Sequence, residues 1–467
     1  MPPSFLPMAL SSALLLASPQ GNTMAAEPPG YYRAPLSVST TRDPDLPKYA
    51  SRAPVKGPAN WQGPSWLDLG LDHRIRFEYR HDDIRRPTAG TDEPFLHRTR
   101  FYAGVHDVLD PFRFAVEVAD SRRWNSQWPE DNRDVNEWEF IRLYAELHDA
   151  DLLGHDPKGH ARPAFLRWGI HNFEFLDRRL VANNQWRNTA NTFLGFHSSL
   201  GAEINDWQLD LLAVQPIARR MHQPDEPIHG QWLFGAIGHW RRWSDVATLE
   251  PFYLALRQSA TSTAPEHIVH SPGLRAYGII GNSGFDWDAD VVVQSGHTGN
   301  NSLTAFGTTA ELGYRFPLPW QPRLSAFYGY ASGDRNPNDS KDQRFERFYG
   351  FARPWSASEY AGFENISAPK VRLEITPHRN LRIDTGWNWY ALASARDRFF
   401  PAAVRDPSGR SGRSVGQEFD FRARWQITPQ LETILGYAHF SPGSFISQTI
   451  RPDASDFIYL EVNIKAF

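Results

Sequence analysis

Apolar and polar residues alternate strictly in many segments of this chain. In residues 67–81 (LDLGLDHRIRFEYRH), Leu, Ile, Phe and Tyr alternate with Asp, Arg and Glu. The last eleven residues, FIYLEVNIKAF, follow the same rule, as do 113–119, 285–293 and 419–425. A period of two indicates β-strands with one apolar and one polar face. Soluble sandwich strands seldom alternate over such lengths with so much charge on one face.

The connections between these segments fall into two classes. Short links with turn residues include 109–111, 282–284, 377–380 and 428–430. The long polar stretches are 82–94, 122–136, 172–191, 215–230, 259–271, 332–364, 395–414 and 442–454. Short turns on one side and long loops on the other are typical of bacterial outer-membrane barrels. The sequence therefore predicts an all-β fold, a closed transmembrane antiparallel β-barrel of about 18 strands over residues 65–467, with the last strand paired to the first.

Aromatic residues support this prediction. The chain has 17 Trp and 30 Phe, although its mean hydropathy is only −0.52. Outer-membrane barrels concentrate such residues in girdles at the two membrane interfaces. The alternative, a large soluble β-sandwich or propeller, would require blade repeats, which the sequence lacks.

The N-terminal region indicates export. Residues 1–26 contain an apolar core at 5–17 and small residues at 24–26, which predicts a secretory signal peptide, with a short buried helix as the alternative. Residues 27–64 are rich in Pro, Ser and Arg and are predicted to form a flexible periplasmic lead-in. We therefore expect a protein of the bacterial outer membrane, in contact with its lipid. The terminal Phe467 resembles the signal that the barrel-assembly machinery reads.

Several classes of function are excluded or unsupported. The formal net charge of −4 argues against nucleic-acid binding, and the absence of Cys excludes disulfides and thiolate metal sites. Residues 334–339 resemble half a calcium loop but lack the glycine at its sixth position. No catalytic pair can be assigned. We expect a monomeric non-enzyme without cofactor or metal.

One segment carries a family resemblance. In LRWGIHNFEFLDRRLVANNQWRNTANTF, residues 166–193, the order of Gly169, Asp177, Arg179-Leu180, Trp186, Asn188-Thr189 and Phe193 resembles the alginate export family of outer-membrane proteins. Residues 285–296 and 328–339 resemble two later signatures of that family. Ile170-His171 depart from its usual Arg-Gln, and the last turn, 428–430, is short where the archetypal exporter has a long loop. The resemblance implies an 18-stranded barrel that passively exports an anionic polysaccharide.

The polar phase of the strands is rich in arginine and poor in lysine. Rings of guanidinium groups in a pore select anions. The predicted pore-lining, anion-binding residues are Arg74, Arg76, Arg98, Arg100, Arg142, Arg167, Arg372, Arg422 and Arg424. The predicted constriction lies in the loop 172–191, with Asp177, Arg178, Arg179 and Arg187. The alternative role for these arginines is to brace the wall through carboxylate ladders.

Three functions remain open at this point. The first is passive transport of an anionic polysaccharide or related acidic solute through an arginine-lined lumen. The second is a substrate-selective diffusion porin for small organic acids. The third is a barrel enzyme or adhesin whose long loops carry the function.

Overall fold

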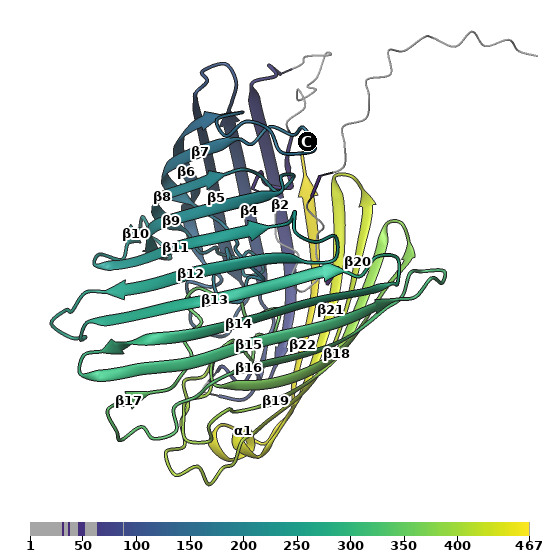
Figure 1. The fold of residues 1–467 in the computed structure, drawn as a ribbon. Helices are drawn as coiled ribbons and strands as arrows, with labels where there is room; N and C mark the ends of the chain where they lie inside the picture. Colours follow the sequence, from purple (N-terminus) through teal and green to yellow (C-terminus); the bar gives the residue numbers. More distant parts are fainter. Residues whose placement is uncertain (1–29, 32–35, 38–44, 52–62, 87, 467) are drawn as a thin grey trace, which may run out of the picture.

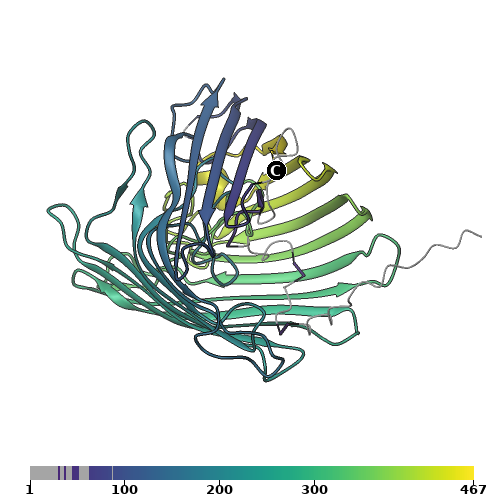
Figure 2. The ribbon, with the colours of Figure 1, turned by 90° about the horizontal axis from the view of Figure 1, so that it is seen from above.

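The strands close into one antiparallel β-barrel (Figures 1 and 2). The computed structural model describes residues 30–31, 36–37, 45–51, 63–86 and 88–466. The long strands of this part of the chain are β2 (Leu67–His81), β4 (Phe95–Val105), β5 (Phe112–Trp124), β6 (Asn136–Asp149), β7 (Ala164–His171), β8 (Phe193–Leu200), β9 (Trp207–Ala218), β11 (Gln231–Trp240), β12 (Thr248–Gln258), β13 (His267–Ile279), β14 (Phe285–Thr298), β15 (Asn301–Arg315), β16 (Arg323–Ala331), β18 (Ile366–His378), β19 (Leu381–Ala391), β20 (Ser414–Thr428), β21 (Leu431–Pro442) and β22 (Ser455–Lys465). Each pairs with its neighbours in the chain, and β22 pairs with β2 from Asp72↔Lys465 to His81↔Asp456. The predicted closed barrel of 18 strands is confirmed.

The remaining regular elements are short. They are β1 (Ala50–Ser51), β3 (Thr91–Asp92), β10 (Glu226–Pro227), β17 (Lys341–Asp342) and α1 (Ser444–Thr449). Among the described residues, no helix is both long enough and apolar enough to cross a membrane.

The two ends of the barrel differ in their connections. At one end, here called the terminal end, β2 begins, β22 ends and most turns are short, such as 379–380 and 429–430. At the other, here called the loop end, long connections such as 332–365 and 392–413 gather with β17 and α1 (Figure 1). This is the asymmetry that the sequence predicts for an outer-membrane barrel.

The strands direct their polar side chains inward and their apolar side chains outward, the reverse of the arrangement in a soluble protein. Inward-facing Asp72, Arg74 and Arg76 of β2 are buried, whereas Phe101 of β4 and Leu143 of β6 are among the exposed large apolar side chains. An apolar exterior around a polar interior is the pattern that lipid requires of a barrel wall.

Two loops from the loop end fold into the barrel. Residues 172–192 connect β7 to β8, residues 332–365 connect β16 to β18, and a parallel bridge between Val181 and Tyr349 joins them. Their apolar side chains pack on the inner faces of β9, β11–β16 and β18 in one continuous core, which includes Val181, Phe345 and Trp355. This half of the lumen is therefore filled, and open space remains on the side of β2, β4, β6 and β18–β22.

Part of the predicted lead-in has defined contacts. Strand β2 extends past the end of β22, where the amide N of Ala466 donates to Leu71 O. Ala50 and Ser51 pair with Gly70 and Leu69 on the edge of β2 that is left open. An unpaired strand edge favours the addition of another strand, so residues 45–51 differ from the flexible segment that composition predicts. The predicted signal peptide, Phe467 and most of residues 27–64 lie outside the described residues.

Candidate functional site

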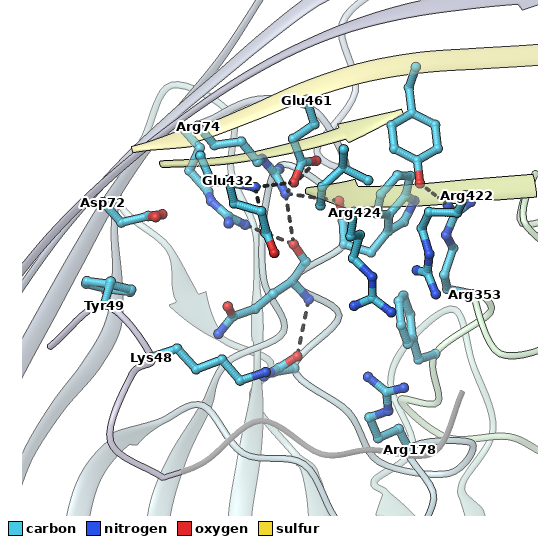
Figure 3. Close-up of a pocket in the computed structure, with 18 of the residues that line it drawn as sticks. Lys48, Tyr49, Asp72, Arg74, Arg178, Arg353, Arg422, Arg424, Glu432 and Glu461 are labelled. Atoms are coloured by element: carbon cyan, nitrogen blue, oxygen red, sulfur yellow. Dashed lines mark hydrogen bonds and ion pairs between the residues drawn. The ribbon is translucent and has the colours of Figure 1, made fainter. Parts of the chain in front are cut away.

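The open part of the lumen contains a charged cavity of about 400 Å³ (Figure 3). Among the described residues, twelve basic and six acidic side chains line it. The basic residues are Lys48, Arg74, Arg98, Arg100, Arg142, Arg178, Arg353, Arg372, Arg382, Arg422, Arg424 and Lys465. The acidic residues are Asp72, Glu174, Asp384, Asp420, Glu432 and Glu461. The wall therefore carries an excess of positive charge, although the whole chain is slightly acidic.

Seven of the nine arginines predicted to line the pore meet at this cavity. They are Arg74, Arg98, Arg100, Arg142, Arg372, Arg422 and Arg424. Arg76 lies instead beside a second cavity of about 30 Å³ nearer the loop end. Arg167 is paired with Glu146 and Asp45, 2.5 and 2.7 Å away, and does not line either cavity.

Several of these arginines pair with carboxylates on neighbouring strands. Arg372 contacts Asp384 at 2.5 Å and Asp420 at 2.8 Å, and Arg142 Nη1 lies 2.8 Å from Glu117 Oε2. Such buried pairs fix the inner wall, because removing one partner leaves an uncompensated charge. The bracing alternative thus has a clear structural counterpart for these residues.

Other arginines hold the inward loop in place. Arg74 donates to Arg187 O at 2.8 Å and to Asn188 Oδ1 at 3.0 Å, and Arg98 donates to Gln185 O at 3.0 Å. Residues 183–188 have no regular secondary structure, so their buried carbonyl groups need partners from elsewhere. The guanidinium groups of β2 and β4 supply them.

Trp186 lies between the two cavities and lines both of them. Its ring is 4.3 Å from the guanidinium carbon of Arg76 and 3.7 Å from that of Arg353, and 4.7 Å from the ring of Tyr459. It lines both cavities, together with Ala357. Cation–π attraction to the two guanidinium groups holds the indole in place, between the large cavity and the smaller one nearer the loop end.

The predicted constriction residues divide into two pairs. Arg178 lines the large cavity, and Arg187 lines the small one. Asp177 and Arg179 instead form an ion pair with each other, and Arg179 lies over the rings of Phe327 and Trp355. They belong to the packing of the loop against the wall and do not line either cavity.

The two inward loops are also joined by charge. Arg187 Nε lies 3.1 Å from Glu359 Oε2, and Arg85 of a third loop lies 3.5 Å from the same oxygen. Burial raises the pKa of Glu359, but Arg187, Arg85 and Arg133 together hold the pKa of this carboxyl below its usual value. The carboxylate therefore remains ionised and keeps the loops together at neutral pH.

Sequence reasoning missed several residues that line the cavity, including one aromatic and three basic ones. Lys48 and Tyr49 lie in the predicted lead-in, Arg353 lies in a long loop, and Lys465 lies on the closing strand. Only Lys465 carried a usable signal, since it shares the polar phase of β22 with Glu461. The other three reach the lumen through folding of irregular segments, which strand periodicity does not report.

Comparison with known proteins agrees with this architecture. A family model described as alginate export matches residues 65–458. Comparison with curated proteins found no match. The solved structures of the Pseudomonas aeruginosa porins OccK11 (OpdR) and OccK2 (OpdF), the latter in complex with glucuronate, are each 13% identical with a TM-score of 0.55. They cover 86% and 85% of this chain, and the alignments span 96% and 97% of theirs.

Another solved structure, P. aeruginosa OpdK with vanillate, is 12% identical with a TM-score of 0.54, and covers 85% of this chain and 98% of its own. At such identities these likenesses concern the fold. The family model, in contrast, matches nearly the whole barrel, from just before β2 into β22. This chain, an outer-membrane channel by its architecture, belongs to the alginate export family.

Proposed function

We propose that this channel binds and passes carboxylate-bearing solutes, and that uronic acids, free or as units of an anionic polysaccharide, are its substrate class. The observation that carries the proposal is the twofold excess of basic over acidic side chains around the cavity. In a narrow, low-dielectric passage such an excess raises the local concentration of anions.

Some of the positive charge is not neutralised by the wall. Within the described residues, Arg98 and Arg353 have no carboxylate within 4.0 Å, and the side chain of Arg382 has no ion pair or hydrogen bond. Arg424 lies 3.8 Å from Asp384, a loose contact. Arg382 and Arg424 are therefore available for an anion that enters the cavity, while Arg98 and Arg353 add positive charge to its wall although they donate to Gln185 O and to the Tyr459 hydroxyl. The pairing of the other arginines leaves them as braces.

The size of the cavity supports a small occupant. Ligand pockets for small molecules measure roughly 300–1,000 Å³, and about 400 Å³ is open here. A single acidic sugar fits that volume, whereas a continuous polymer requires the loops around Trp186 to move. The glucuronate and vanillate bound in two structures of the same fold are both carboxylates, which supports the substrate class.

The second candidate is a diffusion porin for small organic acids. The limited space beyond Trp186 favours it, because the neighbouring cavity that this residue also lines measures only about 30 Å³. Current block by oligomeric uronate separates the candidates: an exporter of polysaccharide binds a tetramer more tightly than the monomer, whereas a porin for small acids does not.

The purified protein in planar bilayers tests the proposal. We expect wild-type reversal potentials to show anion preference at about 0.1 M salt, where the screening length is about 10 Å. The double variant Arg382→Gln/Arg424→Gln should reduce that preference. Arg242→Gln/Arg257→Gln makes the same charge change outside the cavity and should leave it unchanged. A cation-selective wild type would overturn the proposal.

A further inference from the structure

The N-terminal segment 45–49 enters the lumen beside the large cavity. Pro47, Lys48 and Tyr49 line the cavity, and Figure 3 shows Lys48 and Tyr49 across it from Arg422 and Arg424. Tyr49 is buried, and its hydroxyl donates to Glu117 Oε1 at 2.5 Å. The segment thus reaches the charged wall of the passage.

Asp45 makes the contact that defines a binding site. Arg167 Nη1 and Nη2 donate to its two carboxylate oxygens at 2.9 and 2.7 Å. This two-pronged geometry is the one in which arginine recognises carboxylates most specifically. The contact with Asp45 therefore indicates that the outer edge of Arg167 binds a carboxylate.

Residues of the barrel wall hold the Arg167 side chain in place without a contribution from Asp45. Arg167 Nε donates a hydrogen bond to Glu146 Oε2 at 2.5 Å, and the guanidinium carbon lies 4.1 Å from the ring centre of Phe165 and 4.6 Å from that of Tyr144. Only 9% of the Arg167 side chain is exposed. These contacts fix the guanidinium plane, so its outer edge stays directed at the position of the Asp45 carboxylate.

Asp45, in contrast, remains accessible to solvent. Its side chain is 61% exposed in spite of the ion pair, so a solute in the lumen can reach the carboxylate and the two donors that it occupies. The rest of the segment 45–51 is held by the hydrogen bond from the Tyr49 hydroxyl to Glu117 and by the two-residue pairing of β1 with β2. A carboxylate in solution can therefore compete for the same two donors.

We propose that the outer edge of Arg167 is a carboxylate-binding subsite and that Asp45 is its tethered resting occupant. A uronate or another carboxylate solute binds there by displacing Asp45, which loosens residues 45–49 from the passage. This inference rests on the proposed function, because it assumes that carboxylate solutes enter the channel.

Current block by glucuronate in planar bilayers tests the subsite in the full-length protein. Asp45→Asn should lower the half-blocking concentration by about tenfold, because a short tether holds its group at an effective concentration in the millimolar range. Asp107→Asn is the matched control, since Asp107 is also an exposed aspartate, 67% accessible, paired with an arginine, but in the turn between β4 and β5. It should leave the block unchanged, and so should glucose used in place of glucuronate.

A second measurement follows the segment itself. The chain has no native cysteine, so Leu46→Cys introduces a single thiol at a position packed against Tyr49 and Tyr102. Saturating glucuronate should increase its rate of maleimide modification, with the same half-effect concentration as the block.

The outcomes separate the two proposals. An anion-selective wild type that is blocked by glucuronate equally with and without Asp45, or a modification rate that glucuronate does not change, overturns the subsite alone. A wild type without anion preference and without glucuronate block overturns the proposed function, and the subsite with it.

Discussion

Arg74 and Arg382 line the same cavity, but their surroundings differ. Arg74 is 2% exposed, and its donors are bound to Gln185 O, Trp186 O, Arg187 O and Asn188 Oδ1. Arg382 is exposed, and its side chain has no hydrogen-bond or ion-pair partner among the described residues. One residue type on the same polar phase of two strands thus serves two purposes. The Nη donors of Arg74 are bound to the loop, and its remaining donor, Nε, is buried, whereas the guanidinium of Arg382 is open to a solute.

The two arginines should respond differently to substitution. Arg74→Gln should destabilise the folded barrel by about 1–3 kcal/mol, because buried carbonyl groups of the loop lose their donors. Arg382→Gln should leave thermal unfolding unchanged and reduce anion preference. Thermal unfolding in detergent and reversal potentials, measured on both variants, check this. If Arg74→Gln changed selectivity without a loss of stability, Arg74 would be a solute site and not a brace.

At the scale of elements, the strands β7 and β8 approach each other through two glycines. Gly169 pairs with Gly195, and both have positive φ angles, 140° and 151°. A Cβ at Gly169 would overlap Leu143 O of β6. The glycine of the family signature is therefore required where the backbone of β6 lies too close for a Cβ, directly before the inward loop.

Gly169→Ala should consequently impair assembly of the barrel. Gly90→Ala is the matched control, because Gly90 has a similar φ of 133° but a Cβ added there would meet nothing within 4 Å, so that only backbone strain is introduced. The folded fraction, measured as heat-modifiable mobility on SDS gels, should fall strongly for Gly169→Ala and little for Gly90→Ala. Equal losses would show that strain, and not the contact with β6, sets the requirement.

The alternation of residues was sufficient to predict the elements but not all their connections. Strand faces follow from local sequence, because a period of two places charge inward and apolar groups outward along each strand. The connection at Gly299 and Asn300 is a two-residue turn at the loop end, and it falls outside the long polar stretches that the sequence predicts as loops. The sequence contains one indication of this turn, a glycine, which has a φ of 57° in the structure. Polar residues on both sides of the glycine made the turn hard to recognise.

For the whole molecule, the wall could be predicted and the filling of the lumen could not. The sequence placed seven of nine arginines at the cavity because their side of the wall is set by strand phase. The open space lies on one side of the lumen because two loops fill the other side. Their position depends on contacts between segments far apart in the chain, such as the bridge between Val181 and Tyr349. No local pattern encodes such a contact. The same holds for Asp45 and Tyr49, which reach the lumen from a segment of irregular composition.

The filling of the lumen also determines how the channel should conduct. A barrel of this strand number encloses a wide lumen unless loops fold inward, and here Trp186, between Arg76 and Arg353, lies between the large cavity and the smaller one nearer the loop end. We therefore expect Trp186→Ala to increase single-channel conductance severalfold and to weaken anion preference, because ions then pass farther from the charged wall and are better screened. Trp138→Ala is the control, since Trp138 is 69% exposed and lines neither cavity. Single-channel recordings in planar bilayers measure both effects. An unchanged conductance in Trp186→Ala would place the conducting path elsewhere in the barrel, away from the cavity that the arginines surround.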